Sequence, residues 1–257
     1  MITCRLQGGL GNQLFQIAAT YALAIRNGDI CGFDINSCHT PLQGNTANTY
    51  KDNIFTKIKD VGNLKFRVSY NEPHFGYQEL PYADGLILNG YFQSDKYFND
   101  FEEEIKNLFV LDNSNALNYL VSINNKNLPI TSVHIRRGDY LKNQEFHKPC
   151  SLEYYKESMK LIGDSIFIII SDDIEWVKNN IKGENIYYSP FKNELDDLSL
   201  MVVSNNNIIA NSSFSWWGAY LNPNKEKQVI VPKQWFGPLG PKDIQDLFPE
   251  KWLIVDK

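Results

Sequence analysis

The sequence has no apolar run near the roughly 18 residues that a membrane-spanning helix needs, and its first residues lack the long apolar core of a signal peptide. It also has no excess of basic residues. With a formal net charge of −5 it lacks the basic stripe that is typical of nucleic-acid-binding proteins. We therefore expect a cytoplasmic protein without a nucleic-acid partner, and leave open a peripheral association with the inner face of the membrane.

Cysteine is scarce as well. The four thiols, Cys4, Cys31, Cys38 and Cys150, show neither C-x-x-C pairing nor the spacing of metal ligands. This usage is typical of free thiols in a reducing compartment. Histidine, aspartate and glutamate form no cluster with ligand spacing either, so the sequence predicts no metal cofactor.

What the sequence does contain is a regular alternation of apolar strand patterns and helical patterns through both halves. This order is typical of the α/β class with parallel sheets. A length of 257 residues suits two domains. The polar, turn-prone residues 124–127 provide a boundary, so we predict one domain over 1–127 and a second over 128–257.

The most informative stretch is 129–139, where a β-branched apolar run after a proline predicts a buried strand. It ends in Arg136, Arg137 and, after a glycine, Asp139. Neighbouring strand side chains point to opposite faces, so the two arginines should diverge. Open α/β sheets bind ligands beyond the carboxyl ends of their strands, where the fork of an arginine suits a phosphate. Alternatively, Asp139 pairs with an arginine and braces the loop, a pairing that we expect for Arg137 rather than for Arg136.

A glycine-rich turn joins the first predicted strand, at 2–6, to a helical pattern that Gly28 ends. Such a turn lets the backbone approach a ligand, and the helix start that follows favours an anion. The pair Gly9 and Gly11, with Asp34 beyond the next strand, also resembles a dinucleotide fingerprint, but Leu14 stands where the third glycine belongs. A purely structural tight turn is a third alternative.

Two further strand ends carry polar groups. The apolar run 166–170 ends at Asp172 and Asp173 before a helix, where a carboxylate can cap the helix or accept hydrogen bonds from the edge of a guanine. The run 207–210 ends in the polar loop 211–215, which opens a helix and offers a second anion cradle. Trp216 and Trp217 follow there, and we expect them in the core.

Four motifs together resemble the α-1,2-fucosyltransferases of glycosyltransferase family 11. They are GGLGNQ at 8–13, HIRRGD at 134–139, SDD at 171–173 and NSSFSWWG at 211–218, and their order and spacing agree with the family. The resemblance implies the GT-B architecture, in which two Rossmann-like halves face a cleft. It implies a GDP-fucose donor held mainly by the C-terminal half, and an N-terminal half on the acceptor side. It also implies a galactose-type acceptor, an α-1,2 linkage made with inversion, and a role in glycan or surface-polysaccharide synthesis.

The chemistry of the transfer suggests the roles of Arg136, His134 and Asp139, and the resemblance suggests that of Asn12. Arg136 would meet the charge that develops on the leaving phosphate, as oxyanion holes do. Asn12 would lie near the reacting centre, His134 would orient the motif from the core, and Asp139 would brace the loop. These four form the predicted catalytic set, and the general base stays unassigned. The predicted donor-binding residues are Gly9, Gly11, Asn12, Gln13, His134, Arg136, Asp172, Asp173, Asn211, Ser212, Ser213, Phe214 and Ser215.

The acceptor side is less distinct. Tyr91, Phe92 and Gln93 follow a short predicted strand and suit a sugar groove, although aromatics in this setting are more often core. Two other functions stay open on the residues alone. One is a nicotinamide-dependent oxidoreductase that uses the Gly9-Leu10-Gly11 loop. The other is a non-catalytic sugar-binding module, which an aromatic content of 13% would suit.

Overall fold

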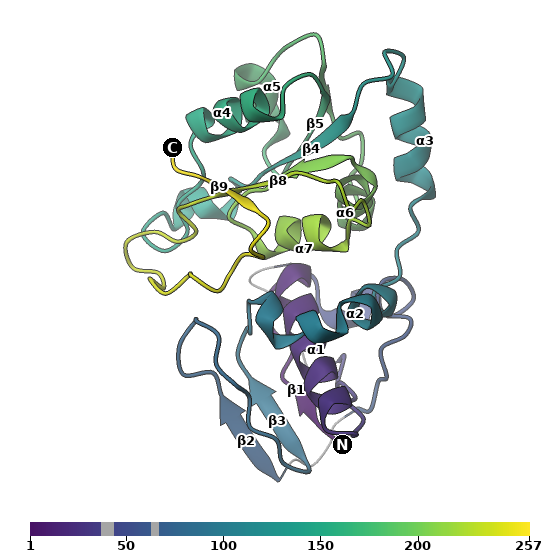
Figure 1. Cartoon of the computed structure of the whole chain (residues 1–257), viewed down its shortest axis with the longest axis vertical. Coiled ribbons are helices and arrows are strands. Elements are labelled where there is room, and N and C mark those ends of the chain that lie inside the picture. Colours follow the sequence, from purple (N-terminus) through teal and green to yellow (C-terminus); the bar gives the residue numbers. More distant parts are fainter. Residues whose placement is uncertain (37–43, 63–66) are drawn as a thin grey trace. The chain divides into compact units, whose positions relative to one another are not determined.

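The computed structural model describes residues 1–36, 44–62 and 67–257, which form two compact units (Figure 1). The first unit comprises residues 1–111 and 243–249, and the second comprises 112–242 and 250–257. The predicted boundary at 127/128 therefore differs from the division at 111/112. The difference arises because helix α3 (Ser114–Ile123) buries Ala116 and Leu120 in the core of the second unit.

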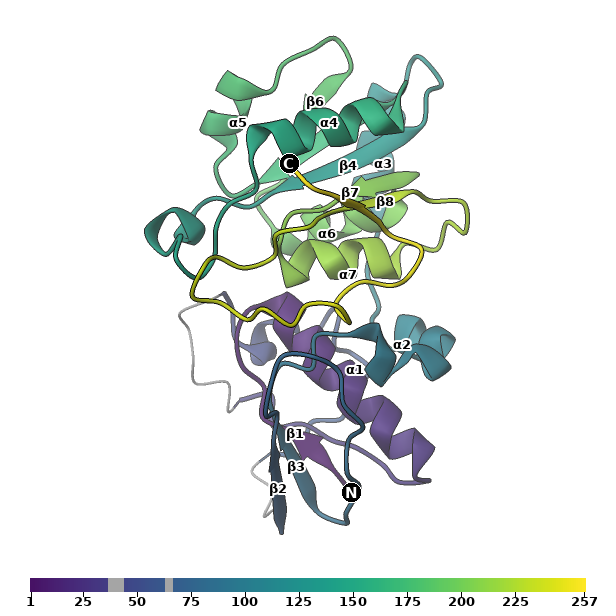
Figure 2. The ribbon, with the colours of Figure 1, turned by 60° about the vertical axis from the view of Figure 1, so that its left-hand side comes forward.

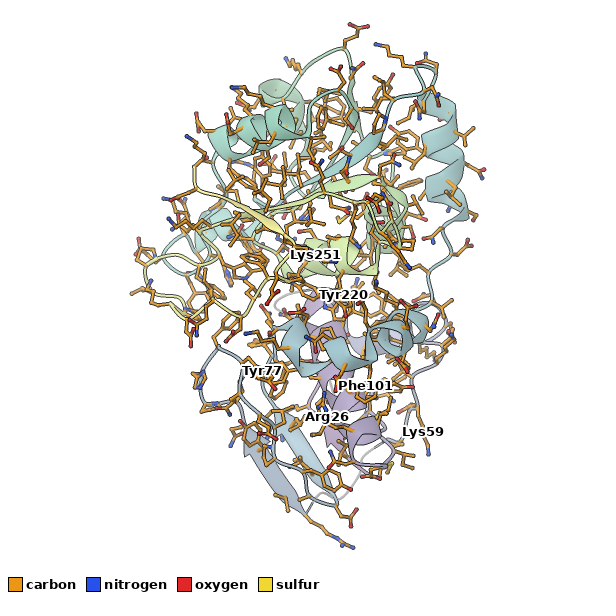
Figure 3. All side chains as sticks on the ribbon, viewed as in Figure 1. Arg26, Lys59, Tyr77, Phe101, Tyr220 and Lys251 are labelled. Carbon is orange, nitrogen blue, oxygen red and sulfur yellow. The ribbon has the colours of Figure 1, made fainter. Side chains whose placement is uncertain are left out.

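The first unit is built on three parallel strands in the order β1-β3-β2. Its long helix α1 turns a continuous apolar face toward the sheet, with Leu14, Phe15 and Ile17 fully buried. At the other end of this helix Arg26 pairs with Asp100 and lies over the ring of Phe101, which Figure 3 labels. The elements are β1 (Thr3–Cys4), α1 (Leu10–Arg26), η2 (Ala47–Tyr50), β2 (Val68–Asn71), β3 (Leu86–Asn89), η3 (Asp95–Tyr97), η4 (Asn99–Phe101) and α2 (Glu102–Leu108).

The second unit has six parallel strands in the order β6-β5-β4-β7-β8-β9. Central strands β4 and β5 are buried on both faces, as their continuous apolar sequences predict. The strands are β4 (Ile130–Ile135), β5 (Ile166–Ser171), β6 (Ile186–Tyr188), β7 (Asn206–Ile208), β8 (Val229–Pro232) and β9 (Leu253–Val255). The helices after α3 are η5 (Asp139–Lys142), α4 (Leu152–Ile162), α5 (Ile174–Asn180), α6 (Glu194–Val203) and α7 (Ser213–Leu221).

Helices cover both faces of this sheet (Figure 2). Tyr154 and Tyr155 of α4 and Val177 of α5 pack on one face, together with Phe167 and Ile169 of β5. The intervening β5 residues face α3 and α6 on the other side. The alternation of the β5 side chains thus divides the core into two layers, as the doubly wound arrangement requires.

Several predicted details are confirmed. Ser151 caps α4 by accepting a hydrogen bond from the Tyr154 amide at 3.0 Å. Trp216 and Trp217 are fully buried. Cys4, Cys31 and Cys150 are free thiols, while Cys38 lies outside the described residues. In the described part of the chain, no helix is long and apolar enough to cross a membrane.

Candidate functional site

The six strands of the second unit run in one direction, so their carboxyl ends meet at one edge of the sheet. Strand β4 lies between β5 and β7, and the chain order reverses at the junction of β4 and β7. Such a switch point is where open α/β sheets bind ligands. The segment that begins with Arg136 follows β4, and the loop 211–215 comes after β7, so the two motifs flank this point.

Arg136 is held by two carboxylates. Its guanidinium donates to Asp139 at 2.7 Å and to Asp172 at 3.1 Å, and it lies over the Tyr140 ring with 5.5 Å between Cζ and the ring centre. A third of the side chain stays exposed. The prediction that Asp139 pairs with Arg137 is wrong. The 3₁₀ turn η5 brings Asp139 back to Arg136, three residues earlier in the chain.

Arg137 diverges from Arg136, as the strand geometry predicts. Its Nε donates to Asp173 at 3.0 Å, and its guanidinium lies 3.7 Å above the Trp176 ring. Only 17% of the side chain is exposed. Arg137 therefore ties β4 to α5, and its charge is already matched by a carboxylate and an aromatic face.

Asp172 and Asp173 both have structural partners. Asp172 accepts from Arg136 and from the Arg137 amide at 2.9 Å. Asp173 accepts from the Trp176 amide at the start of α5 and from Arg137. Gly138 passes so close that an added Cβ would lie 2.6 Å from the Asp172 carboxylate. These contacts make both aspartates braces of the arginine motif, and their predicted guanine recognition stays a prediction.

His134 is the last residue but one of strand β4, and its side chain is buried in the protein. The residue is 5% exposed, its ring lies 5.6 Å from that of Phe214, and its Nδ1 is buried without a hydrogen-bond partner. Burial, with a smaller contribution from Arg136, lowers the pKa of His134 to about 3. The imidazole is therefore neutral at neutral pH, and its unpaired Nδ1 is enclosed in the protein.

Asn211 is enclosed by three segments. Its amide donates to the carbonyls of Lys148 and Trp235, both at 2.8 Å, and its own carbonyl accepts from the Tyr140 hydroxyl at 3.0 Å. The side chain thus fixes the loops around the switch point. These contacts favour a bracing role for Asn211 over its predicted contact with the donor.

The next four residues open helix α7. Ser212 is its N-cap residue, and the buried Ser215 hydroxyl lies 3.3 Å from the Ser212 carbonyl, which accepts its hydrogen bond. Ser213 and Phe214 are half-buried. Ser213 is therefore the residue here whose hydroxyl and amide best suit an anion.

Asp197 is a candidate that the sequence patterns did not single out. It lies in the first turn of α6 and accepts a hydrogen bond from the Ser189 hydroxyl, at the carboxyl end of β6, at 2.5 Å. Burial raises the pKa of Asp197 to about 6. Three acidic residues begin this helix, and only the helix phase shows which of them faces the strand ends. The acidic residue was therefore visible in the sequence, but it resembles the acidic residues that commonly begin a helix.

In the first unit, the glycine-rich loop leads directly into α1. Gly8 adopts a positive φ of 75°, and an added Cβ would lie 2.4 Å from the Asn12 amide. Asn12 Oδ1 accepts from Gln93 at 2.8 Å. Gly9 is the N-cap residue, and Gly11 is buried in the first turn of α1.

Gln13 is fully buried. Its amide donates to the carbonyls of Gly8 and Asn45 at 2.8 and 2.9 Å. Gln13 thus braces the loop, while the half-buried Asn12 is the loop side chain better placed to meet a ligand.

The segment 91–93, for which we expected core aromatics and left an acceptor groove as the alternative, is mostly core. Phe92 is fully buried, and the Tyr91 and Phe92 amides donate to the Glu72 carboxylate at 2.6 and 3.0 Å. Gln93 is 8% exposed. Its hydrogen bond to Asn12 is therefore the link between this segment and the glycine-rich loop.

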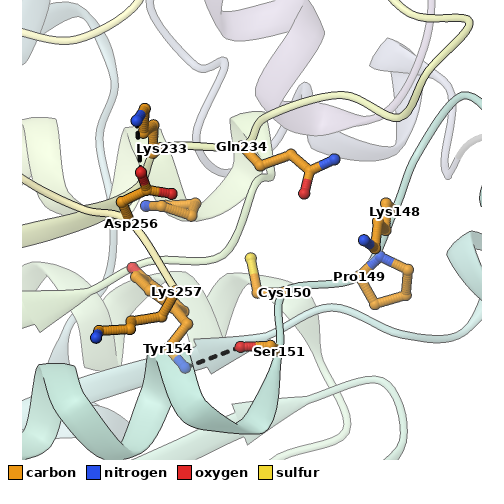
Figure 4. A pocket seen from close by; sticks show the side chains of 10 residues that line it. Lys148, Pro149, Cys150, Ser151, Tyr154, Lys233, Gln234, Asp256 and Lys257 are labelled. Carbon is orange, nitrogen blue, oxygen red and sulfur yellow. Dashed lines mark hydrogen bonds and ion pairs between the residues drawn. The ribbon is translucent and has the colours of Figure 1, made fainter.

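A hollow of about 270 Å³ lies beyond β8 and β9 (Figure 4). Figure 4 shows two interactions at its wall. One is the ion pair between Lys233 and Asp256, and the other is the hydrogen bond that the Ser151 hydroxyl accepts from the Tyr154 amide at the start of α4. None of the predicted site residues lines it. Its Cys150 thiol donates to Asn211 at 3.3 Å, and burial raises the pKa of Cys150 to about 11, so the group is unreactive.

Two α/β units with parallel sheets, one with Arg136 and the start of α7 at its switch point and the other with a glycine-rich helix start, are typical of glycosyltransferases of the GT-B type. The sequence profile described as Glycosyl transferase family 11 matches residues 1–255, and the chain belongs to this family. The predicted family, fold class and enzyme class are thereby confirmed. Membership along the whole chain also removes the oxidoreductase and the non-catalytic module as alternatives.

Individual relatives agree with this assignment. The chain is 30% identical to the O-antigen biosynthesis glycosyltransferase WbnK of Escherichia coli, over 92% of this chain and 95% of that one. It is also 30% identical to an α-1,2-colitosyltransferase of Escherichia coli, over 100% and 99%. The mouse galactoside 2-α-L-fucosyltransferase Sec1 is 26% identical over 86% and 64%. The NodZ α-1,6-fucosyltransferase soaked with GDP-fucose shares the fold, with a TM-score of 0.52 and 14% identity over 86% and 92%.

Proposed function

We propose that this protein transfers L-fucose from GDP-fucose to the 2-hydroxyl of a galactose-type acceptor, with inversion at the anomeric carbon. The observation that carries the proposal is Arg136, an arginine with a third of its side chain exposed at the switch point of the sheet. The names of the relatives support the sugar and the linkage: Sec1 is a galactoside 2-α-L-fucosyltransferase, and the structural neighbour was soaked with GDP-fucose.

The chemistry follows from the charges. When the bond between the sugar and the phosphate breaks, negative charge develops on the β-phosphate and positive charge on the sugar ring. Arg136 can meet the phosphate with two directed hydrogen bonds, because Asp139 and Asp172 hold its fork in place before the donor arrives. The start of α7 at Ser213 supplies further polar contacts, and His134 orients the motif from the core. In the first unit, we propose that the Asn12 side chain and the Gly9–Gly11 backbone serve as hydrogen-bond donors.

Guanine recognition requires a carboxylate whose oxygens are not all engaged. Asp172 and Asp173 each have two partners, whereas Asp197 has the Ser189 hydroxyl on one oxygen. A carboxylate can accept from both the ring N–H and the amino group of guanine. We therefore place Asp197 first among the three candidates.

The remaining assignments complete the proposal. The second unit binds the donor, and the first unit serves the acceptor side. The expected location is cytoplasmic, with peripheral association at the inner membrane face where surface polysaccharides are made. One relative is an O-antigen biosynthesis glycosyltransferase, which supports that setting.

The experiment is direct. The protein is incubated with GDP-fucose and a panel of galactosides, and the released GDP and the glycosylated product are quantified. A parallel series with GDP-colitose is included, because an α-1,2-colitosyltransferase matches over the whole chain. Product with GDP-fucose supports the proposal. Product with GDP-colitose alone would show that colitose, and not fucose, is the donor sugar. No product with either donor would reject the proposal.

A further inference from the structure

A histidine that belongs to none of the motifs is packed near Arg136. The His147 ring stacks on that of Tyr140, with ring centres 4.7 Å apart and planes 12° apart. Phe146 and Phe236 enclose it from other directions, at 4.7 and 5.8 Å. Three aromatic contacts hold a half-buried imidazole in one orientation, as a catalytic group requires.

The backbone around His147 is fixed as firmly. The residue's amide donates to the Asn143 carbonyl at 2.8 Å, and the Gly237 amide donates to the Phe146 carbonyl at 2.8 Å. An added Cβ at Gly237 would lie 2.4 Å from the Gln144 carbonyl, so only glycine permits this approach of the two loops. The segments 143–147 and 236–240 therefore form one paired loop, which we call the His147 platform.

Tyr140 connects the platform to the phosphate-binding arginine. Its ring contacts both the Arg136 guanidinium and the His147 imidazole, and its hydroxyl is anchored on the Asn211 carbonyl. In an inverting transfer the leaving phosphate, the anomeric carbon, the acceptor hydroxyl and the base follow one another at steps of about 3 Å. A group one aromatic ring away from Arg136 is at the right scale for the last position.

His147 is also in the right chemical state. Among the described residues, neither of its ring nitrogens has a hydrogen-bond partner, and neither is enclosed. Burial lowers the pKa of His147, Arg136 lowers it further, and Asp139 raises it in part. The net pKa lies below the ordinary value, so the imidazole is neutral at neutral pH and can accept a proton.

We propose that His147 is the general base that accepts the proton of the acceptor hydroxyl, an inference that rests on the proposed glycosyl transfer. The hydroxyl oxygen forms a bond to the anomeric carbon as its proton passes to the imidazole. The bond from that carbon to the β-phosphate oxygen breaks, and its electron pair leaves with GDP. Asp139 is less suited to this step, because its carboxylate is bound by Arg136.

The test compares two substitutions at His147. His147→Phe keeps the aromatic packing and removes both nitrogens, and His147→Gln keeps polarity without basicity. Both should lower kcat on the order of 10²-fold or more, the usual scale of general-base catalysis. Both should keep the melting shift that GDP gives, since the base does not hold the nucleotide. The exposed His74→Gln serves as the control and should retain full activity.

The pH profile separates catalysis from packing. The wild-type kcat/KM should fall as the pH drops through a pKa below 6.5, because protonated imidazole cannot accept the proton. The profile of kcat at saturating GDP-fucose is compared as well, because the raised pKa of Asp197, the candidate for guanine recognition, would act through donor binding and therefore through KM. Retention of activity and of the acid limb by His147→Phe would show that the ring only fills space. If the wild type makes no product, the proposed function fails and the base fails with it; if the wild type is active, only the base is at stake.

Discussion

At the scale of single residues, the two adjacent arginines have separate tasks. Lysine in place of Arg136 keeps a charge but loses the fork that can hold a phosphate through two hydrogen bonds. Arg136→Lys should fold normally and lose activity on the order of 10²-fold, mainly in kcat, because the contact strengthens as the phosphate leaves. Steady-state kinetics beside melting curves provides the measurement.

Arg137→Lys should behave in the opposite way. This substitution loses the stacking on Trp176 and weakens the pair with Asp173, which joins β4 to α5. The melting temperature should fall, whereas the activity of the folded protein should change little. A folded but inactive Arg137→Lys beside an active Arg136→Lys would show that the phosphate is bound by the other arginine.

Nucleotide preference tests the carboxylates. GDP should raise the melting temperature more than UDP or ADP does, and Asp197→Asn should remove this difference, because an amide NH₂ replaces an acceptor. Asp196→Asn, one residue earlier on α6, is the matched control. If Asp172→Asn or Asp173→Asn removes the preference while Asp197→Asn keeps it, guanine is recognised by Asp172 or Asp173, as the sequence predicts.

His134 makes the stability of the protein depend on pH. Its pKa is about 3 in the folded protein and near 6.5 in the unfolded chain. Between these values only the unfolded chain binds the proton, so the free energy of unfolding should fall as the pH falls, by about 1.4 kcal/mol per pH unit from this group. His134→Gln should flatten that slope in urea unfolding between pH 6 and pH 4. An unchanged slope would assign the acid sensitivity to other groups.

At the scale of elements, the helices and strands with a clear apolar periodicity were predictable from the sequence. Strand β5 and helix α1 lie where they were expected, because the apolar run 166–170 and the helical pattern that Gly28 ends are clear. Edge strand β2 was not predicted, since its residues are largely exposed and show no buried alternation. The Arg136–Asp139 pair was predicted wrongly, because no local pattern announces the 3₁₀ turn that follows Gly138. Asp197 was missed because it resembles ordinary helix-start charge, and His147 was missed because its contact with Phe236 joins segments that are distant in the sequence.

The His147 platform gives a prediction at this scale. Gly237→Ala should separate the paired loops, because its Cβ would meet a backbone carbonyl and not a movable side chain. Transfer should fall while GDP still protects against melting. Gly183→Ala, where the nearest atom is a flexible Ile186 carbon at 3.1 Å, is the control. Full activity in Gly237→Ala would mean that the loop pairing does not matter for transfer.

At the scale of the whole molecule, the absence of a metal requirement stays a prediction. The described residues contain no group of three or more His, Cys, Asp or Glu side chains that could hold an ion. We expect activity to survive a chelator, because we place Arg136 where a cation would otherwise meet the leaving phosphate. Complete loss with EDTA, restored by manganese or magnesium, would contradict the arginine-based mechanism.

The path of the chain has a consequence for its synthesis. The chain passes between the two units three times, because residues 243–249 return to the first unit. There Asp246 binds Lys96, accepts from the Tyr77 amide at 3.1 Å, and offers its carbonyl to the Ser94 hydroxyl. On the ribosome, the first unit therefore gains residues 243–249 only after the whole of residues 112–242 has been made. The half that is begun first is completed late, and its partial core stays without that segment throughout the interval.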